Sequence, residues 1–164
     1  MHACCWHVAR LPLPGESVAA AALHAEPGGK GLNVAVGLAR LGCQVATLMA
    51  CGSDGPAAQL LALLDAEGID RRHVQQLPGA SGMGCGLVGP GGENLVAVYP
   101  GANALLTAAH AEAAADDLRA AQLVYAQLEA ALPAAARALA IAAAAGVVTV
   151  LNPSPWHAPS AALR

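Results

Sequence analysis

The segment Pro27-Gly28-Gly29-Lys30-Gly31-Leu32-Asn33 combines a mobile backbone with two polar side chains, and Lys30 is the only lysine in the chain. Its glycines let a ligand approach the backbone closely. Free N–H groups in the first turn of a helix bind oxygen atoms. Lys30 and Asn33 are three residues apart, so both side chains leave that turn on the same side. The segment predicts a cradle for a hydroxyl or phosphate group. The alternative interpretation is a glycine-rich surface turn without a ligand.

Two better-known glycine motifs do not match this segment. A P-loop needs a glycine where His24 stands, and a serine or threonine in place of Gly31. A dinucleotide-binding fingerprint needs a third glycine where Val34 stands. Both motifs are therefore rejected.

Polar residues also follow the predicted strands, at the positions where ligands bind in open α/β sheets. Asp54 follows the first of these strands, Gln127 and Glu129 follow the second, and Asn152 follows the third. A carboxylate at such a position can accept a hydrogen bond from a sugar hydroxyl. Alternatively, Glu129 is only a helix N-terminal residue favoured by the helix dipole. The residues alone leave both interpretations open.

These groups need helices and strands to position them. We predict helices over 31–41, 56–67 and 134–145, and strands over 44–50, 123–126 and 147–151. This alternation favours parallel strands joined by crossover helices. Segments 84–88 and 95–99 are joined by the turn-rich hexapeptide 89–94, which predicts an antiparallel hairpin outside the parallel layer. Residues 16–26 are candidates for further strands beside this hairpin.

Composition limits the classes of function. The 164 residues suffice for one modest domain, and 56% apolar against 12% charged residues excludes a disordered chain. A net charge of −3 offers no electrostatic basis for binding nucleic acid or an anionic membrane. Charged residues, glycines or prolines interrupt every apolar stretch before the roughly 18 residues that a membrane span needs. We therefore expect a cytoplasmic protein without nucleic-acid or membrane partners.

Cysteines and histidines show no catalytic or metal-binding spacing. The five cysteines lack a CxxC motif, which favours reduced thiols in the cytosol. The six histidines suggest neither a metal site nor a catalytic dyad, and no G-x-S-x-G elbow occurs.

Taken together, the motifs resemble the N-terminal half of ribokinase and the wider ribokinase-like (PfkB) carbohydrate kinase family. The resemblance extends from about Pro12 to Pro155. The matching segments are PGE at 14–16, GGKGLNVA at 28–35, ARLG at 39–42, GSD at 52–54, GEN at 92–94, PGAN at 100–103, QLE at 127–129 and NPSP at 152–155.

The resemblance implies an α/β fold, namely a three-layer αβα sandwich with a mostly parallel sheet and a small β-sheet lid. Residues 1–164 would form one partial domain, with lid segments at about 16–26 and 84–99. The implied reaction is ATP-dependent phosphorylation of a sugar hydroxyl, with ribose as the first candidate and magnesium carried by the nucleotide. The implied substrate-binding residues are Gly29, Lys30, Gly31, Asn33 and Glu129, and no residue is assigned to catalysis or to a metal.

The chain also departs from the family pattern. The family's sugar-binding aspartate falls on Ala3, and the strand that precedes it has no residues here. The family's later elements, including the anion hole and the catalytic aspartate, have no match before Arg164. We therefore expect a domain truncated at both ends, which retains part of the sugar site and is inactive alone.

Two other interpretations stay open from the sequence. One is a non-catalytic sugar-binding or interaction module derived from the family, and the other is a remnant that neither folds nor binds well. If copies of the chain associate, we expect contact through the lid or an exposed sheet edge, because unpaired strand edges favour association.

Overall fold

The computed structural model describes residues 1–155, and three of its helices lie where the sequence predicts them. They are α1 (Lys30–Arg40), α2 (Gly55–Ala66) and α5 (Leu132–Ala144). A proline lies in the first turn of both α2 and α5, where its missing N–H costs nothing. The chain leaves α1, α2 and α5 through glycines with positive φ at positions 42, 68 and 146. Local sequence signals thus set the helix boundaries.

Two pairs of parallel strands lie among the helices. β3 (Ala46–Cys51) pairs with β4 (Asp70–Gln76), and β7 (Leu123–Gln127) pairs with β8 (Val148–Asn152). The sequence predicted β3, β7 and β8 within two residues of their bounds. It missed β4, whose sequence DRRHVQQ lacks an apolar run.

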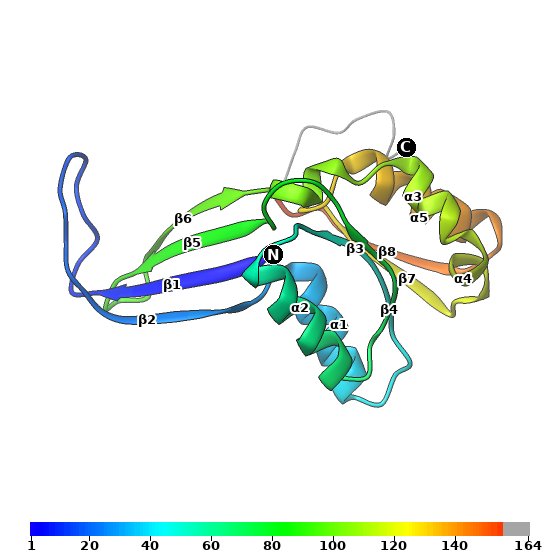
Figure 1. Ribbon diagram of the computed structural model, residues 1–164, viewed down its shortest axis with the longest axis horizontal. Coiled ribbons are helices and arrows are strands. Elements are labelled where there is room, and N and C mark those ends of the chain that lie inside the picture. The colour runs from blue at the N-terminus through cyan, green and yellow to red at the C-terminus, as the bar shows by residue number, and fades with distance from the viewer. Residues whose placement is uncertain (156–164) are drawn as a thin grey trace.

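A separate four-stranded sheet has the order β2-β1-β5-β6 and extends away from the helices (Figure 1). β5 (Met83–Val88) and β6 (Asn94–Tyr99) form the antiparallel hairpin that the hexapeptide turn predicts. β2 (Ala20–Pro27) lies largely within the segment proposed for a further strand. β1 (His2–Val8), which was not predicted, lies between β2 and β5.

The expectation of a mostly parallel sheet is wrong. The described strands form three sheets, because β3–β4 and β7–β8 each remain a pair, and the four-stranded sheet is mixed. In it, β1 is antiparallel to β2 but parallel to β5. The segments that connect the strands explain why some pairs are parallel and others antiparallel, since consecutive strands become parallel only where a crossover carries the chain back. Helices α2 and α5 provide crossovers for β3–β4 and β7–β8, whereas short turns or loops join β1 to β2 and β5 to β6.

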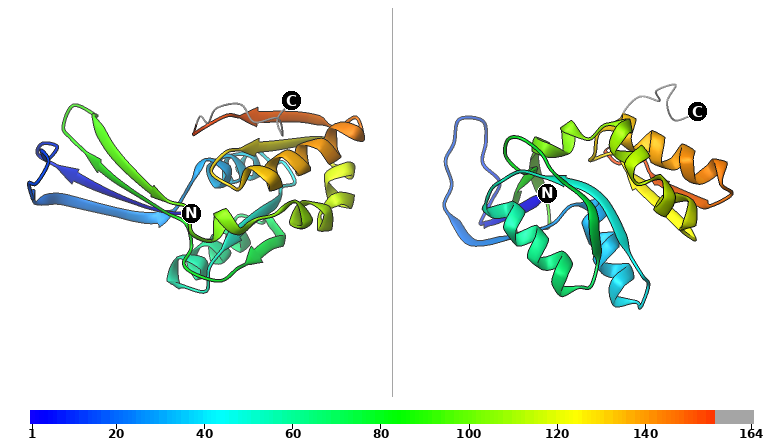
Figure 2. Two further views of the ribbon diagram at one scale, coloured as in Figure 1. Left: turned by 90° about the horizontal axis from the view of Figure 1, so that it is seen from above. Right: turned by 45° about the vertical axis from the view of Figure 1, so that its right-hand side comes forward.

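Strand β3 lies between two hydrophobic clusters, so helices cover both of its faces (Figure 2). On one side Cys51 packs with residues of α1 and α2, including the fully buried Leu64. On the other side Ala50 packs with η1 (Gly101–Leu105) and Ala134 of α5. The short helices α3 (Ala108–Ala113) and α4 (Ala115–Ala120) pack against α5. Within residues 1–155, no helix is long and apolar enough to span a bilayer.

Candidate functional site

The glycine-rich turn lies at the N-terminus of α1, as the sequence predicts. Gly29 is the N-cap residue and has φ 108°, a backbone conformation that favours glycine. Lys30 is the first residue of the helix, and no side chain of the cap residue satisfies the exposed N–H groups. The helix therefore begins with free donors that another element must satisfy.

Glu129 supplies the missing acceptor from a distant segment. It follows β7, and its Oε2 accepts a hydrogen bond of 2.8 Å from the backbone N–H of Lys30. Its Oε1 forms an ion pair with Lys30 Nζ. The Glu129 side chain is 12% exposed and that of Lys30 is 39% exposed. The carboxylate therefore lies largely buried at the positive end of α1, where the helix dipole stabilises it.

This arrangement combines the two interpretations of Glu129 that the sequence left open. Glu129 is a carboxylate at a helix N-terminus, but the helix is α1, 99 positions away in sequence, rather than the α5 helix that follows it. The same contact brings Glu129 to the turn that holds Lys30.

Two glycines allow these elements to approach closely. A Cβ built on Gly29 would lie 3.2 Å from Glu129 Oε2, and one built on Gly31 would lie 3.4 Å from Gln127 Nε2. Gln127 also accepts a hydrogen bond from the backbone N–H of Glu129, which fixes the turn after β7. Gln127 is thus a positioning residue for the carboxylate.

Four of the five expected binding residues meet in this arrangement: Gly29, Lys30, Gly31 and Glu129. The fifth, Asn33, shares the first turn of α1 and is exposed. Its side chain makes no hydrogen bond to the Lys30–Glu129 pair or to any other group within residues 1–155.

The other polar residues at strand ends behave differently. Asp54 caps α2 by accepting a hydrogen bond of 3.0 Å from the Ala57 N–H. It also accepts bonds from the Ser81 hydroxyl at 2.6 Å and the Ser81 N–H at 2.7 Å. The hydrogen bonds from Ser81 hold the pKa of Asp54 below its ordinary value. Asn152 lies opposite Gln127 in the β7–β8 register. Asp54 is therefore a structural carboxylate that links α2 to the segment leading into β5.

The N-terminal residues of the chain, at the start of β1, approach the glycine-rich turn. A Cβ built on Gly28 would lie 3.0 Å from Ala3 Cβ, and one built on Gly29 would lie 3.3 Å from Met1 Cβ. Ala3 therefore faces the turn, and the position where the resemblance expects an aspartate carries only a methyl group. The N-terminus, marked in Figure 1, lies where this sheet meets the helices.

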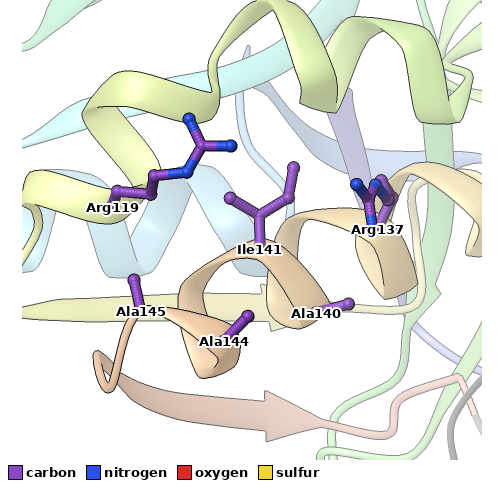
Figure 3. Close-up of a pocket in the computed structure, with 6 residues that line it drawn as sticks. All are labelled: Arg119, Arg137, Ala140, Ile141, Ala144 and Ala145. Carbon is purple, nitrogen blue, oxygen red and sulfur yellow. The ribbon is translucent and has the colours of Figure 1, made fainter.

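A groove in the described part of the chain lies apart from the Lys30–Glu129 arrangement. This groove, of about 350 Å³ between α4 and α5, is lined by Arg119, Arg137, Ile141 and three alanines (Figure 3). Arg119 pairs with Asp116 and Arg137 with Glu112, so both charges are already partnered. None of its lining residues belongs to the Lys30–Glu129 arrangement.

Histidines and cysteines form no metal cluster within residues 1–155, where no three His, Cys, Asp or Glu side chains are placed to hold an ion. The His7 and His24 rings lie edge to face with centroids 5.3 Å apart, a pairing that sequence spacing did not reveal. The five cysteines are free thiols. His157 lies outside the described residues.

Comparisons with known proteins agree with the motif resemblance. The family model described as pfkB family carbohydrate kinase matches residues 5–163. A ribokinase of Staphylococcus aureus is 37% identical over 158 residues, which cover 92% of this chain and 50% of that protein. A deoxyribokinase of Salmonella typhi is 33% identical over 147 residues, covering 89% of this chain and 48% of that protein. The chain thus spans about half the length of the curated relatives it matches.

Solved structures show the same fold over a similar share. The crystal structure of ribokinase from Cryptococcus neoformans in complex with ADP superposes with a TM-score of 0.83 and 26% sequence identity. That match covers 96% of this chain and 49% of the other. The mixed α/β architecture of this chain therefore matches about half of a ribokinase structure.

Proposed function

The chain belongs to the pfkB family of carbohydrate kinases, and from that premise we propose that it carries the sugar-binding part of a kinase that phosphorylates a monosaccharide hydroxyl. The observation that carries this proposal is the Lys30–Glu129 pair at the N-terminus of α1. A cation, a carboxylate and glycine backbone are held together there by elements far apart in sequence.

The pair retains capacity for hydroxyl groups. An ammonium has three donors and a carboxylate about four acceptor positions. Each oxygen of Glu129 already accepts one hydrogen bond from Lys30, and Lys30 Nζ uses one donor in return. The remaining donors and acceptors suit vicinal hydroxyls, because each hydroxyl both donates and accepts. Asn33, exposed on the same helical turn, adds an amide that can donate and accept.

We propose D-ribose as the sugar, because the relatives at 37% and 33% identity are named ribokinase and deoxyribokinase. ATP is the proposed phosphoryl donor, supported by the ADP complex of the Cryptococcus neoformans ribokinase. Within residues 1–155, no three His, Cys, Asp or Glu side chains lie close enough to hold a metal ion, so we assign no magnesium ligand among them.

The four-stranded sheet is the proposed lid, since Ala3 of its strand β1 approaches Gly28 of the turn that holds Lys30. Its β6 side chains are exposed, and any association of copies is proposed through this sheet or a free strand edge. A cytoplasmic location remains a prediction from the cysteine usage. For a polypeptide of these residues alone, we expect sugar binding without phosphoryl transfer, because none of them matches the family's catalytic aspartate.

Calorimetric titration with D-ribose tests the proposal. Lys30→Met should weaken binding roughly tenfold or more, because a hydrogen bond to a charged group contributes about 1.5–3 kcal/mol. Arg40→Met is the matched control, since Arg40 lies at the other end of α1 and also forms an ion pair, with Glu67. Equal affinities for the wild type and Lys30→Met would contradict the proposal.

A further inference from the structure

One row of the four-stranded sheet faces the sugar site. The register places Ala3 opposite Glu26 of β2 and opposite Gly84 of β5, and Gly84 opposite Val98 of β6. Residues directly opposite one another on paired strands project from the same face of a sheet. Because the Ala3 methyl group approaches Gly28 of the turn, this whole row projects toward the side where Lys30 and Glu129 lie.

Glu26 is the only member of that row with a polar side chain. Ala3, Gly84 and Val98 offer no side-chain donor or acceptor. Glu26 is exposed, and no hydrogen bond or ion pair of its carboxylate is found within residues 1–155. By contrast, the carboxylates of Glu16, Glu67, Glu112 and Glu129 all have basic partners. Its acceptor capacity is therefore available to a ligand.

The cross-strand position places this carboxylate within reach of a ligand on the turn. Side chains directly opposite in an antiparallel pair have Cβ atoms about 4.5–5.5 Å apart, and a glutamate extends two further bonds beyond Cβ before its carboxyl carbon. Ala3 faces Gly28 of the turn, so Glu26 on the neighbouring strand lies beside the turn as well. Within this row, only Glu26 offers a side-chain acceptor to a hydroxyl of a sugar bound against Lys30 and Gly29.

We infer that Glu26 is a sugar-binding residue, which accepts a hydrogen bond from a hydroxyl of the ligand from the side of the four-stranded sheet. This inference rests on the proposed function and extends it to a residue that no motif identified. Together with Glu129, Glu26 would give the sugar side-chain acceptors from two separate elements of the fold.

The test measures D-ribose affinity by calorimetry for the wild type, Glu26→Ala, Glu26→Gln and the control Glu93→Gln. Glu93 is exposed in the β5–β6 turn, at the opposite end of the sheet, so its variant makes the same change of charge away from the site. We expect Glu26→Ala to weaken D-ribose binding about tenfold, and Glu26→Gln somewhat less, because an amide can still accept one hydrogen bond. Glu93→Gln should bind like the wild type.

A rescue variant separates binding from folding. In Ala3→Asp combined with Glu26→Ala, the carboxylate moves to the opposite strand, and most of the lost D-ribose affinity should return. Wild-type affinity in Glu26→Ala, or an equal loss in Glu93→Gln, would overturn the inference and leave the proposed function standing. A failed rescue with Glu26→Gln equal to the wild type would also overturn it. Absence of D-ribose binding by the wild type would overturn the proposed function and this inference together.

Discussion

Asp54 and Glu129 occupy equivalent positions in the fold but have different surroundings. Each follows a parallel strand, β3 or β7, and each lies at a helix N-terminus. Asp54 caps α2, the helix that follows it directly, and also binds Ser81 on the way to β5. Glu129 does not cap α5, the helix that follows it; it accepts a hydrogen bond from the first N–H of α1 and pairs with the Lys30 ammonium.

The difference shows when a carboxylate at a strand end is available to a ligand. The partners of Asp54 are neutral hydrogen-bond donors from the backbone and a serine, and they hold the joint between the helices and the four-stranded sheet. The partner of Glu129 is a lysine with donors to spare, beside glycines whose backbone a ligand can approach. The same residue type therefore supports the fold at one strand end and a site at the other.

The largest expected effect comes from Gly52, which precedes Asp54. A Cβ built on Gly52 would clash with Gly79 O and lie 2.7 Å from Ser81 N, both backbone atoms. We expect Gly52→Ala to lower the free energy of unfolding by about 3 kcal/mol or more, because backbone must move to relieve the overlap. Chemical denaturation measures it. Gly55→Ala is the control, since a Cβ there meets no atom within 4 Å and should leave the protein at least as stable.

Asp54→Asn should mainly affect stability. An asparagine oxygen can still cap α2, but one neutral oxygen cannot replace both carboxylate oxygens toward Ala57 and Ser81, so we expect a loss of about 2 kcal/mol in denaturation. The D-ribose affinity of the folded variant should stay within about twofold of the wild type. A large drop in affinity would place Asp54 in the binding site and remove the contrast with Glu129.

Glu129→Gln should show the opposite pattern. We expect D-ribose affinity to fall about tenfold or more, because the amide neither retains the charge nor pairs equally with Lys30. The free energy of unfolding should change by about 1 kcal/mol or less, as the glutamine oxygen can still accept from the α1 N–H. Calorimetry and denaturation on the same sample check both values, and stability loss without affinity loss would contradict the assignment.

The smallest expected effect is a pH dependence carried by Asp54. Because hydrogen bonds from Ser81 lower its pKa in the folded state, its contribution to stability is complete above the ordinary aspartate pKa of about 3.9. That contribution is lost as the pH falls through the lowered folded-state pKa. The stability difference between the wild type and Asp54→Asn should therefore shrink as the pH decreases from 5 to about 3 in denaturation series. A difference that stays constant over this interval would contradict the role of the charge.

The sequence predicted the features that depend on local signals. The glycine turn, the helices with proline and glycine boundaries and the β5–β6 hairpin all follow from neighbouring residues. Strand β4 was missed because DRRHVQQ shows neither alternation nor an apolar run, and β1 because the four apolar residues between the histidines of HACCWHV are only a short run. The stability of both strands comes from partners elsewhere. The Lys30–Glu129 contact joins residues 99 positions apart. Spacing could place both residues at the site, but it could not show that Glu129 accepts a hydrogen bond from the first N–H of α1. The sequence likewise could not assign different roles to Asp54 and Glu129, because only the fold brings Ser81 to Asp54.

A titration of the isotope-labelled chain with D-ribose, followed by amide NMR signals, tests most directly that the site lies at Glu129 and not at Asp54. We predict that the amide signals of Lys30, Gly31 and Glu129 shift together along one saturable binding curve. The signals of Ala57 and Ser81, whose amides bind Asp54, should stay in place. Saturable shifts centred on Ala57 and Ser81, with Lys30 and Glu129 unchanged, would contradict the account.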